Sequence, residues 1–158
     1  MISPQILQRL ADLDGKLSLN EGIRLAQLAR TVPVDRAIVE IGSFKGKSAC
    51  YLGTGSRYGE GAPVYAVDLW ELHSSPEYSS HDVFAAWREQ VSQMDLQDVI
   101  TPIRCDSAVL GKLFSQRVGL LFIDGDHSYE SVASDFHAWS PQLVSGGVLV
   151  FHDYADEE

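Results

Sequence analysis

Residues 39–48, with the sequence VEIGSFKGKS, constrain the fold of this chain more than any other segment. The apolar run at 37–41, interrupted only by Glu40, predicts a short buried strand, and Gly42 and Gly46 then bracket a turn into a helix. Glycine lets the backbone pass close to a bound molecule, and the free N–H groups at the start of a helix attract anions. We therefore expect a ligand-binding corner, with Glu40 placed to meet a cationic group of the ligand.

Two glycine motifs of nucleotide-binding proteins are close to this segment. A dinucleotide site needs G-x-G-x-x-G, but positions 44 and 47 are not glycine. A phosphate-binding P-loop is nearer, because residues 42–48 read G-x-x-x-G-K-S, with one residue too few between the glycines. A P-loop-like enzyme that uses Lys47, Ser48 and Asp124 therefore stays open as an alternative.

The same segment resembles the motif E-x-G-x-x-x-G-x-S of the Rossmann-like S-adenosylmethionine (SAM) methyltransferases. The likeness is greatest to the small-molecule O-methyltransferases of the catechol and caffeoyl-CoA type and their bacterial relatives. It implies SAM as cofactor and transfer of a methyl group to a small-molecule acceptor, expected at a hydroxyl oxygen. It also implies that the methionine half of SAM lies against Glu40, Gly42, Ser43, Gly46 and Ser48. A SAM-binding domain without catalysis is a further alternative.

Length and charge limit the other possibilities. The chain has 158 residues, of which 45% are hydrophobic, so we expect one domain, with N-terminal helices in 1–35 and a Rossmann-like core in 36–154. Its net charge of −10 opposes binding to nucleic acid or to an anionic membrane. Cys50 and Cys105 lack a disulfide or metal spacing and are expected to be reduced core thiols. With neither a basic leader nor a long apolar run, the chain is expected to be cytoplasmic.

Helices and strands alternate along the predicted core. Two helices precede the first strand, one ending near Gly15 and one starting at the capping box of Ser18 and Glu21. Further helices are expected at 47–52, 83–94, 108–114 and 128–139, and a glycine-rich loop at 53–63. Further strands are expected at 64–67, 100–105, 120–123 and 148–151. The predicted fold is α/β, a three-layer sandwich around a mostly parallel sheet with strand order 3-2-1-4-5.

Apolar faces are predicted for two of these helices. In the helix at 83–94 the expected core face consists of Val83, Phe84, Trp87, Val91 and Met94. In the helix at 128–139 it consists of Val132, Phe136 and Trp139.

Acids at the strand ends are the next candidates, since ligands of such sheets lie beyond the carboxyl ends of the strands. Asp68, followed by Leu69, lies about 26 residues after Gly42, close to the spacing at which an acid binds ribose hydroxyls. Asp106 and Ser107 end the third strand. The resemblance implies that they meet adenine, and the alternative is that Asp106 is only a helix N-cap.

The fourth strand is followed by Asp124, Asp126 and His127. The O-methyltransferases that this chain resembles place a general base three residues after the acid that ends this strand, and Asp124 and His127 fit that spacing. We therefore predict that His127 takes the acceptor's proton and that Asp126 orients its ring. Asp124 is expected beside the cofactor. The alternative for His127 is a capping or packing role at the start of the next helix.

The fifth strand ends in His152 and Asp153. In the metal-dependent members of the family an acid and an Asp or Asn at this place join the fourth-strand acid around magnesium, which makes Asp124, His152 and Asp153 a candidate divalent-metal site. Imidazole suits zinc, iron or nickel better than magnesium. The alternative is that His152 packs against the substrate.

Two segments carry weaker expectations. The polar stretch 70–81, which contains His73 and His81, is predicted to be a lid over the substrate, and isolated loop histidines of this kind are more often solvated. The family sheet has seven strands, whereas strands six and seven are absent here. We expect either a truncated chain or a five-stranded form whose edge is covered by a partner subunit in a homo-oligomer.

Overall fold

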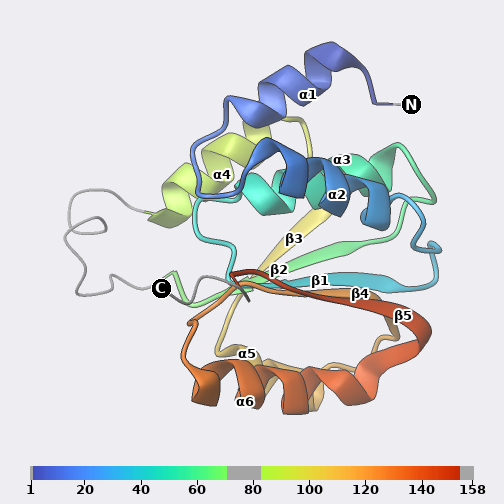
Figure 1. Cartoon of the computed structure of the whole chain (residues 1–158), viewed down its shortest axis with the longest axis vertical. Coiled ribbons are helices and arrows are strands. Elements are labelled where there is room, and N and C mark those ends of the chain that lie inside the picture. The colour runs from blue at the N-terminus through green and yellow to red at the C-terminus, as the bar shows by residue number, and fades with distance from the viewer. Residues whose placement is uncertain (1, 71–82, 154–158) are drawn as a thin grey trace.

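A five-stranded parallel sheet forms the centre of the computed structural model, which describes residues 2–70 and 83–153 (Figure 1). The strands are β1 (Ala37–Ile41), β2 (Val64–Asp68), β3 (Ile100–Arg104), β4 (Val118–Ile123) and β5 (Leu143–Phe151). They are arranged in the order β3-β2-β1-β4-β5, and every neighbouring pair is parallel. The predicted fold class and strand order are confirmed.

Helices cover both faces of this sheet. They are α1 (Pro4–Ala11), α2 (Leu19–Ala29), α3 (Lys47–Arg57), α4 (Val83–Gln93), α5 (Ser107–Leu113) and α6 (Tyr129–Trp139), followed by the short 3₁₀ helix η2 (Ser140–Gln142). Figure 1 shows α1 to α4 on one side of the sheet and α5 and α6 on the other. The predicted capping box of α2 is present, since Ser18 and Glu21 each accept a hydrogen bond from the other's backbone N–H.

The sheet separates two hydrophobic clusters. All six residues of β4 are buried, as expected for a central parallel strand covered on both faces. In β1, Ile38 packs into the cluster with α2 and α3, whereas Val39 and Ile41 pack into the cluster with α5 and α6. Because side chains alternate along a strand, Glu40 shares the face of Ile38 and points toward α3.

Helix α3 is longer than predicted. It continues to Arg57, so the expected loop at 53–63 is wrong for its first five positions, 53–57. The glycines there serve close packing: a Cβ on Gly55 would lie 2.3 Å from the carbonyl oxygen of Ala26 in α2, and one on Gly53 would lie 2.7 Å from Ile100. Glycine therefore lets α3 approach its neighbours and does not break the helix here.

Two predictions at the carboxyl-terminal part of the core need correction. Strand β5 begins at Leu143, five residues before the predicted start, and includes an irregularity at its glycines, where Gly146 has φ +78°. In α6, Trp139 is buried as predicted, but Phe136 is 37% exposed and contacts Phe151 at the surface. The buried residue beside Phe136 is Asp135, a polar side chain that faces the site.

The core face predicted for α4 is buried at Val83, Trp87 and Val91, with Phe84 packed partly buried against it. Both cysteines are free, Cys50 buried and Cys105 partly exposed. None of the helices in the described ranges is long and apolar enough to cross a membrane. The predicted lid, with His73 and His81, lies outside the described residues except for Trp70.

Candidate functional site

A cavity of about 620 Å³ opens at the carboxyl ends of the central strands. The sheet register creates it: Ile41 of β1 pairs with Val67 of β2 and with Ile123 of β4. The next residue of each strand therefore lies in one row, and that row consists of Gly42, Asp68 and Asp124.

Seven of the predicted site residues line this cavity: Gly42, Asp68, Leu69, Asp106, Ser107, Asp124 and Asp126. Its other walls come from residues that the sequence analysis did not select, among them Phe44, Trp70, Cys105, Ser131, Ser134 and Asp135.

Gly42 lies where the backbone of the corner passes closest to β4. It has φ +80°, and a Cβ there would lie 2.2 Å from the carbonyl oxygen of Asp124. Gly46, with φ +90°, starts α3, and a Cβ there would lie 2.7 Å from the ring of Trp87. Both positions thus require glycine, for backbone conformation and for space.

Asp68 holds the corner in shape as well as lining the cavity. Its carboxylate accepts hydrogen bonds from the backbone N–H groups of Ser43 (2.8 Å), Phe44 (2.9 Å) and Trp70 (2.8 Å). The Trp70 indole in turn donates to the carbonyl oxygen of Phe44 at 2.8 Å. The acid predicted to bind ribose is therefore fixed by three backbone groups at the cavity wall.

Glu40, Ser43, Gly46 and Ser48 lie behind the cavity wall and not on it. Glu40 is 0% exposed, accepts a hydrogen bond from the Ser43 hydroxyl, and has one oxygen without a hydrogen-bond partner among the described residues. Trp87 donates to the same hydroxyl at 2.8 Å. Burial raises the pKa of Glu40 to about 8, against the opposing effect of Ser43 and Ser48. These residues support the corner from inside.

The opposite end of the cavity is formed by α5 and α6. Asp106 is the N-cap of α5 and accepts a hydrogen bond from the Val109 N–H at 2.8 Å, so its capping role is present. The Ser107 hydroxyl donates to Asp135, which is only 6% exposed and whose pKa is raised by burial. Ser131 and Asp135, four residues apart, lie on the same face of α6 and line this wall together.

His127 is not among the residues that line the cavity, although it lies beside Asp124, which does, and its side chain is 59% exposed. Its Nε2 lies 3.8 Å from Asp124 and its Nδ1 lies 3.6 Å from Asp153. Asp126 instead accepts hydrogen bonds from the Ser128 N–H (3.1 Å) and the Ser131 hydroxyl (2.8 Å), and these bonds lower its pKa. Among the described residues, the carboxylates within ion-pair distance of His127 are therefore Asp124, at the end of β4, and Asp153, at the end of β5, and not the expected Asp126. Ser128, not His127, caps α6.

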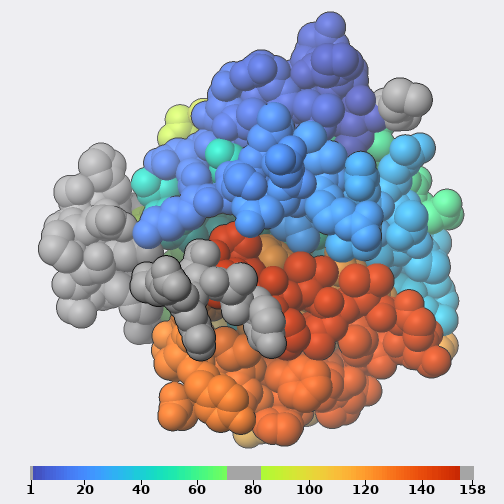
Figure 2. Space-filling view, viewed as in Figure 1, coloured from blue at the N-terminus to red at the C-terminus, as the bar shows by residue number. Residues whose placement is uncertain are grey.

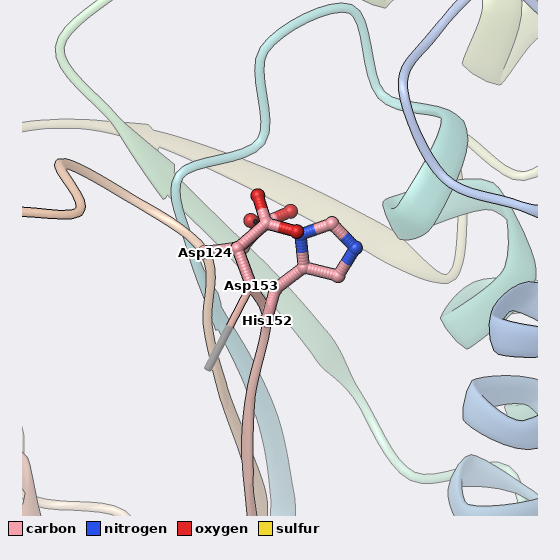
Figure 3. A group of neighbouring side chains, drawn as sticks. All are labelled: Asp124, His152 and Asp153. Carbon is pink, nitrogen blue, oxygen red and sulfur yellow. Dashed lines mark ion pairs between the residues drawn. The ribbon is translucent and has the colours of Figure 1, made fainter. Parts of the chain in front are cut away.

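Asp124, His152 and Asp153 converge from the ends of β4 and β5 (Figure 3). The His152 Nδ1 atom lies 3.0 Å from an oxygen of Asp124 and 3.0 Å from an oxygen of Asp153, and one ligand atom from each of the three residues lies within 4.8 Å of the others. Burial raises the pKa of Asp124 to about 6, although His152 acts in the opposite direction. For His152 the nearby carboxylates outweigh burial and raise the pKa of the ring. One nitrogen and two oxygen donors fit a divalent cation.

Solved structures share this architecture. The chain is similar to an O-methyltransferase of Streptomyces achromogenes involved in tomaymycin synthesis, solved with SAM (TM-score 0.69, 16% identity, covering 95% of this chain and 66% of that one). It is similar to an O-methyltransferase of Bacillus cereus in complex with S-adenosylhomocysteine, SAH (TM-score 0.66, 19% identity, 96% and 67%). It is also similar to an rRNA methylase of Streptococcus thermophilus (TM-score 0.59, 13% identity, 83% and 70%).

Comparison by sequence gives the family. An uncharacterized protein of Acanthamoeba polyphaga mimivirus is 27% identical over 135 residues, which cover 84% of this chain and 58% of that protein. The chain thus spans little more than half the length of this relative. The model of the family described as "Methyltransferase domain" matches residues 39–154, which include the glycine corner and all the strand-end acids. The chain belongs to this methyltransferase domain family.

Proposed function

We propose that this chain is a SAM-dependent methyltransferase domain that methylates a hydroxyl oxygen of a small molecule. The observation that carries the proposal is the cavity at the strand ends, whose described lining includes five aspartates and neither Lys nor Arg. SAM bears a positive sulfonium, a ribose with two hydroxyl donors and an adenine with an amino group. An acidic cavity suits all three of these groups.

The same observation counts against the P-loop alternative. A nucleotide phosphate would meet carboxylates in this cavity and no described cation. Lys47, the candidate phosphate ligand, has its amino group 3.1 Å from the carbonyl oxygen of Ala11, to which it donates a hydrogen bond. Its side chain is thus engaged by the N-terminal helix and not by the glycine corner.

In this proposal each wall of the cavity has one role. Gly42 gives the methionine half room to pass the backbone, Asp68 accepts hydrogen bonds from the ribose hydroxyls, and Ser107 with Asp106 meets the adenine. Leu69 and Asp124 border the same cavity. Glu40, Ser43, Gly46 and Ser48 act indirectly, by holding the corner in its bound shape.

His127 is the proposed general base. SAM supplies a methyl group made electrophilic by its positive sulfur. His127 takes the acceptor's hydroxyl proton as the oxygen forms its bond to the methyl carbon, and the electron pair of the broken carbon–sulfur bond stays on sulfur. Asp124 and Asp153, at 3.8 Å and 3.6 Å from the ring, stabilise the imidazolium that results. A divalent ion at Asp124, His152 and Asp153 would lower the pKa of the same hydroxyl.

Isothermal titration calorimetry with SAM, SAH and Mg-ATP tests the cofactor. We expect binding of SAM and SAH and none of Mg-ATP. Asp68→Asn should weaken SAM binding about tenfold, the effect of losing roughly one hydrogen bond to a charged group. Asp35→Asn, at an exposed acid outside the cavity, is the matched control and should leave affinity unchanged. Urea unfolding of both variants separates lost binding from lost folding.

Turnover is tested with a panel of small hydroxylated acceptors by following SAH release. Methylation of a hydroxyl compound that His127→Gln suppresses would support the proposed chemistry. Binding of Mg-ATP alone would refute the proposal, and SAM binding without turnover on any acceptor would leave only a SAM-binding domain.

A further inference from the structure

The ends of β4 and β5 form a candidate ion site, which is the same site that the proposed function uses. The choice of ion rests on the proposed function only through this shared site. We propose that Asp124, His152 and Asp153 bind a first-row transition ion of the zinc type in preference to magnesium. We further propose that Glu21 of α2 is the positioning residue that holds the imidazole for this ion.

The donor set carries the first half of the inference. Magnesium demands six oxygen ligands in near-octahedral geometry, whereas imidazole nitrogen favours zinc, iron, cobalt or nickel. Here the imidazole stands between the two carboxylates, and its Nδ1 lies 3.0 Å from each of them. In Figure 3 the three side chains point toward one another from adjacent strand ends. An ion at this place would meet one nitrogen and two oxygens.

The state of the His152 ring is the second observation. Both ring nitrogens are buried, and neither makes a hydrogen bond of acceptable geometry within the described residues. These nitrogens lie within ion-pair distance of Asp124, Asp153 and Glu21, and a buried polar atom without a well-formed hydrogen bond calls for an explanation, of which a bound ion is one. The ring is held from the side by Phe122, edge to face at 6.2 Å between centroids, and the backbone N–H of His152 donates to Ile123 at 3.1 Å.

Glu21 supplies the carboxylate that a metal-bound histidine usually has on its other nitrogen. Its Oε1 lies 3.6 Å from the His152 Nε2, an ion-pair distance slightly too long for a hydrogen bond. Its Oε2 accepts the Ser18 N–H at 2.9 Å in the capping box of α2. The cap thus fixes Glu21 while leaving one oxygen for the imidazole. Figure 2 shows the α2 surface (blue) directly bordering that of β5 (red).

Cobalt binding to the full chain, after removal of metal with a chelator, provides the test. Co²⁺ stands in for zinc and absorbs visible light when it is bound by nitrogen and oxygen donors. We expect one Co²⁺ per chain, displaced by an equivalent of Zn²⁺ and not by millimolar Mg²⁺. No SAM and no acceptor are added, so the result is independent of whether the chain transfers methyl groups.

Three variants separate the roles of the residues. His152→Asp should reduce the preference of the site for Co²⁺ over Mg²⁺, because it replaces the imidazole nitrogen with a third carboxylate. Glu21→Gln keeps the capping box, which accepts Glu or Gln, and presents an amide NH₂ to the imidazole. It should weaken Co²⁺ binding by roughly 10- to 100-fold. Ser18→Ala removes the hydroxyl cap and keeps the Glu21 carboxylate, so it should lower stability and leave Co²⁺ affinity unchanged.

Absence of Co²⁺ binding to the unmodified chain would overturn the proposal and leave His152 as an ion-pair partner of the two aspartates. Displacement of Co²⁺ by equal concentrations of Mg²⁺ would overturn the selectivity. Equal losses of Co²⁺ affinity in Glu21→Gln and Ser18→Ala would assign the effect to the helix cap and would overturn the role of Glu21.

Discussion

Replacing Glu40 with Gln is expected to make the stability of the ligand-free protein much less sensitive to pH. Glu40 is completely buried beside Ser43, and burial raises its pKa from 4.5 to about 8. The folded state therefore holds a proton that the unfolded chain releases above pH 4.5. An acid with a raised pKa is fully compatible with folding below pH 4.5, and its ionisation costs stability as the pH rises toward 8.

The size of the effect follows from the two pKa values. Between them, stability falls by about 1.4 kcal/mol for each unit of pH, so the loss from pH 5.5 to pH 8 is roughly 3 kcal/mol. Glutamine cannot ionise, and Glu40→Gln should remove this loss. Burial also raises the pKa of Asp124 to about 6, so its ionisation lowers stability as the pH rises. This loss occurs in both proteins and largely cancels when their stabilities are compared.

Urea unfolding at pH 5.5 and pH 8 measures this difference. With an m-value of about 2 kcal/mol/M, the midpoint of the unmodified chain should fall by roughly 1.5 M more than that of the variant. Glu60→Gln, at an exposed glutamate, is the control and should behave as the unmodified chain does. Parallel pH profiles for the unmodified chain and Glu40→Gln would refute the reasoning, because they would mean that Glu40 is already ionised inside the protein at low pH.

Three further substitutions test the corner, the base and the helix packing. Gly42→Ala should destabilise the domain and prevent SAM binding, because its Cβ would lie 2.2 Å from a carbonyl oxygen. The control is Gly61→Ala, at a glycine with a similar φ of +78° and nothing within 4 Å. It should lower the free energy of unfolding by only about 1 to 2 kcal/mol. Equal melting temperatures for the two variants would contradict this. His127→Gln should lower kcat by roughly 10²- to 10⁴-fold and leave SAM affinity by calorimetry unchanged. A large change in SAM affinity would argue against the role as base. Gly55→Ala should lower the melting temperature although Ala favours helices, since the added Cβ would lie 2.3 Å from a carbonyl oxygen of α2. A higher melting temperature would show that α2 and α3 are not so closely packed.

The fold could be predicted because each buried strand is marked by a run of apolar residues that ends in a polar turn. The run ending at Asp124 and the one ending at Asp68 locate β4 and β2 correctly, and the glycine corner identifies β1. Strand order was predicted from the common order of doubly wound α/β sheets, since periodicity alone does not order parallel strands. The end of α3 could not be predicted, because whether Gly53 and Gly55 break a helix or permit close packing depends on the neighbouring elements β3 and α2, which the local sequence does not contain.

The residues at strand ends are the ones that the sequence brings to the cavity. Asp68, Asp106 and Asp124 line it because strand ends share one edge of a parallel sheet, and their roles toward a ligand stay predictions. Glu40 does not line the cavity, since it lies within β1 on the face of the sheet that packs on α3. Asp135 was missed because a single polar residue on an amphipathic helix does not show from sequence alone that it faces a cavity.

The register of β5 explains why the three residues of the candidate metal site meet at all. The pairing passes from Val118 with Leu143 to Leu120 with Val148, so β5 advances by five residues while β4 advances by two. Gly146, in the left-handed region at φ +78°, lies within this irregularity. Beyond it the strands run in regular register to Ile123 and Phe151, which places His152 directly beside Asp124. Without the extra residues of the irregularity, a β5 of the same sequence would present a different side chain to Asp124, because each one-residue slip along a strand also reverses the face to which the side chains point. The glycine pair within β5 is therefore a determinant of the site, although it lies several residues before His152.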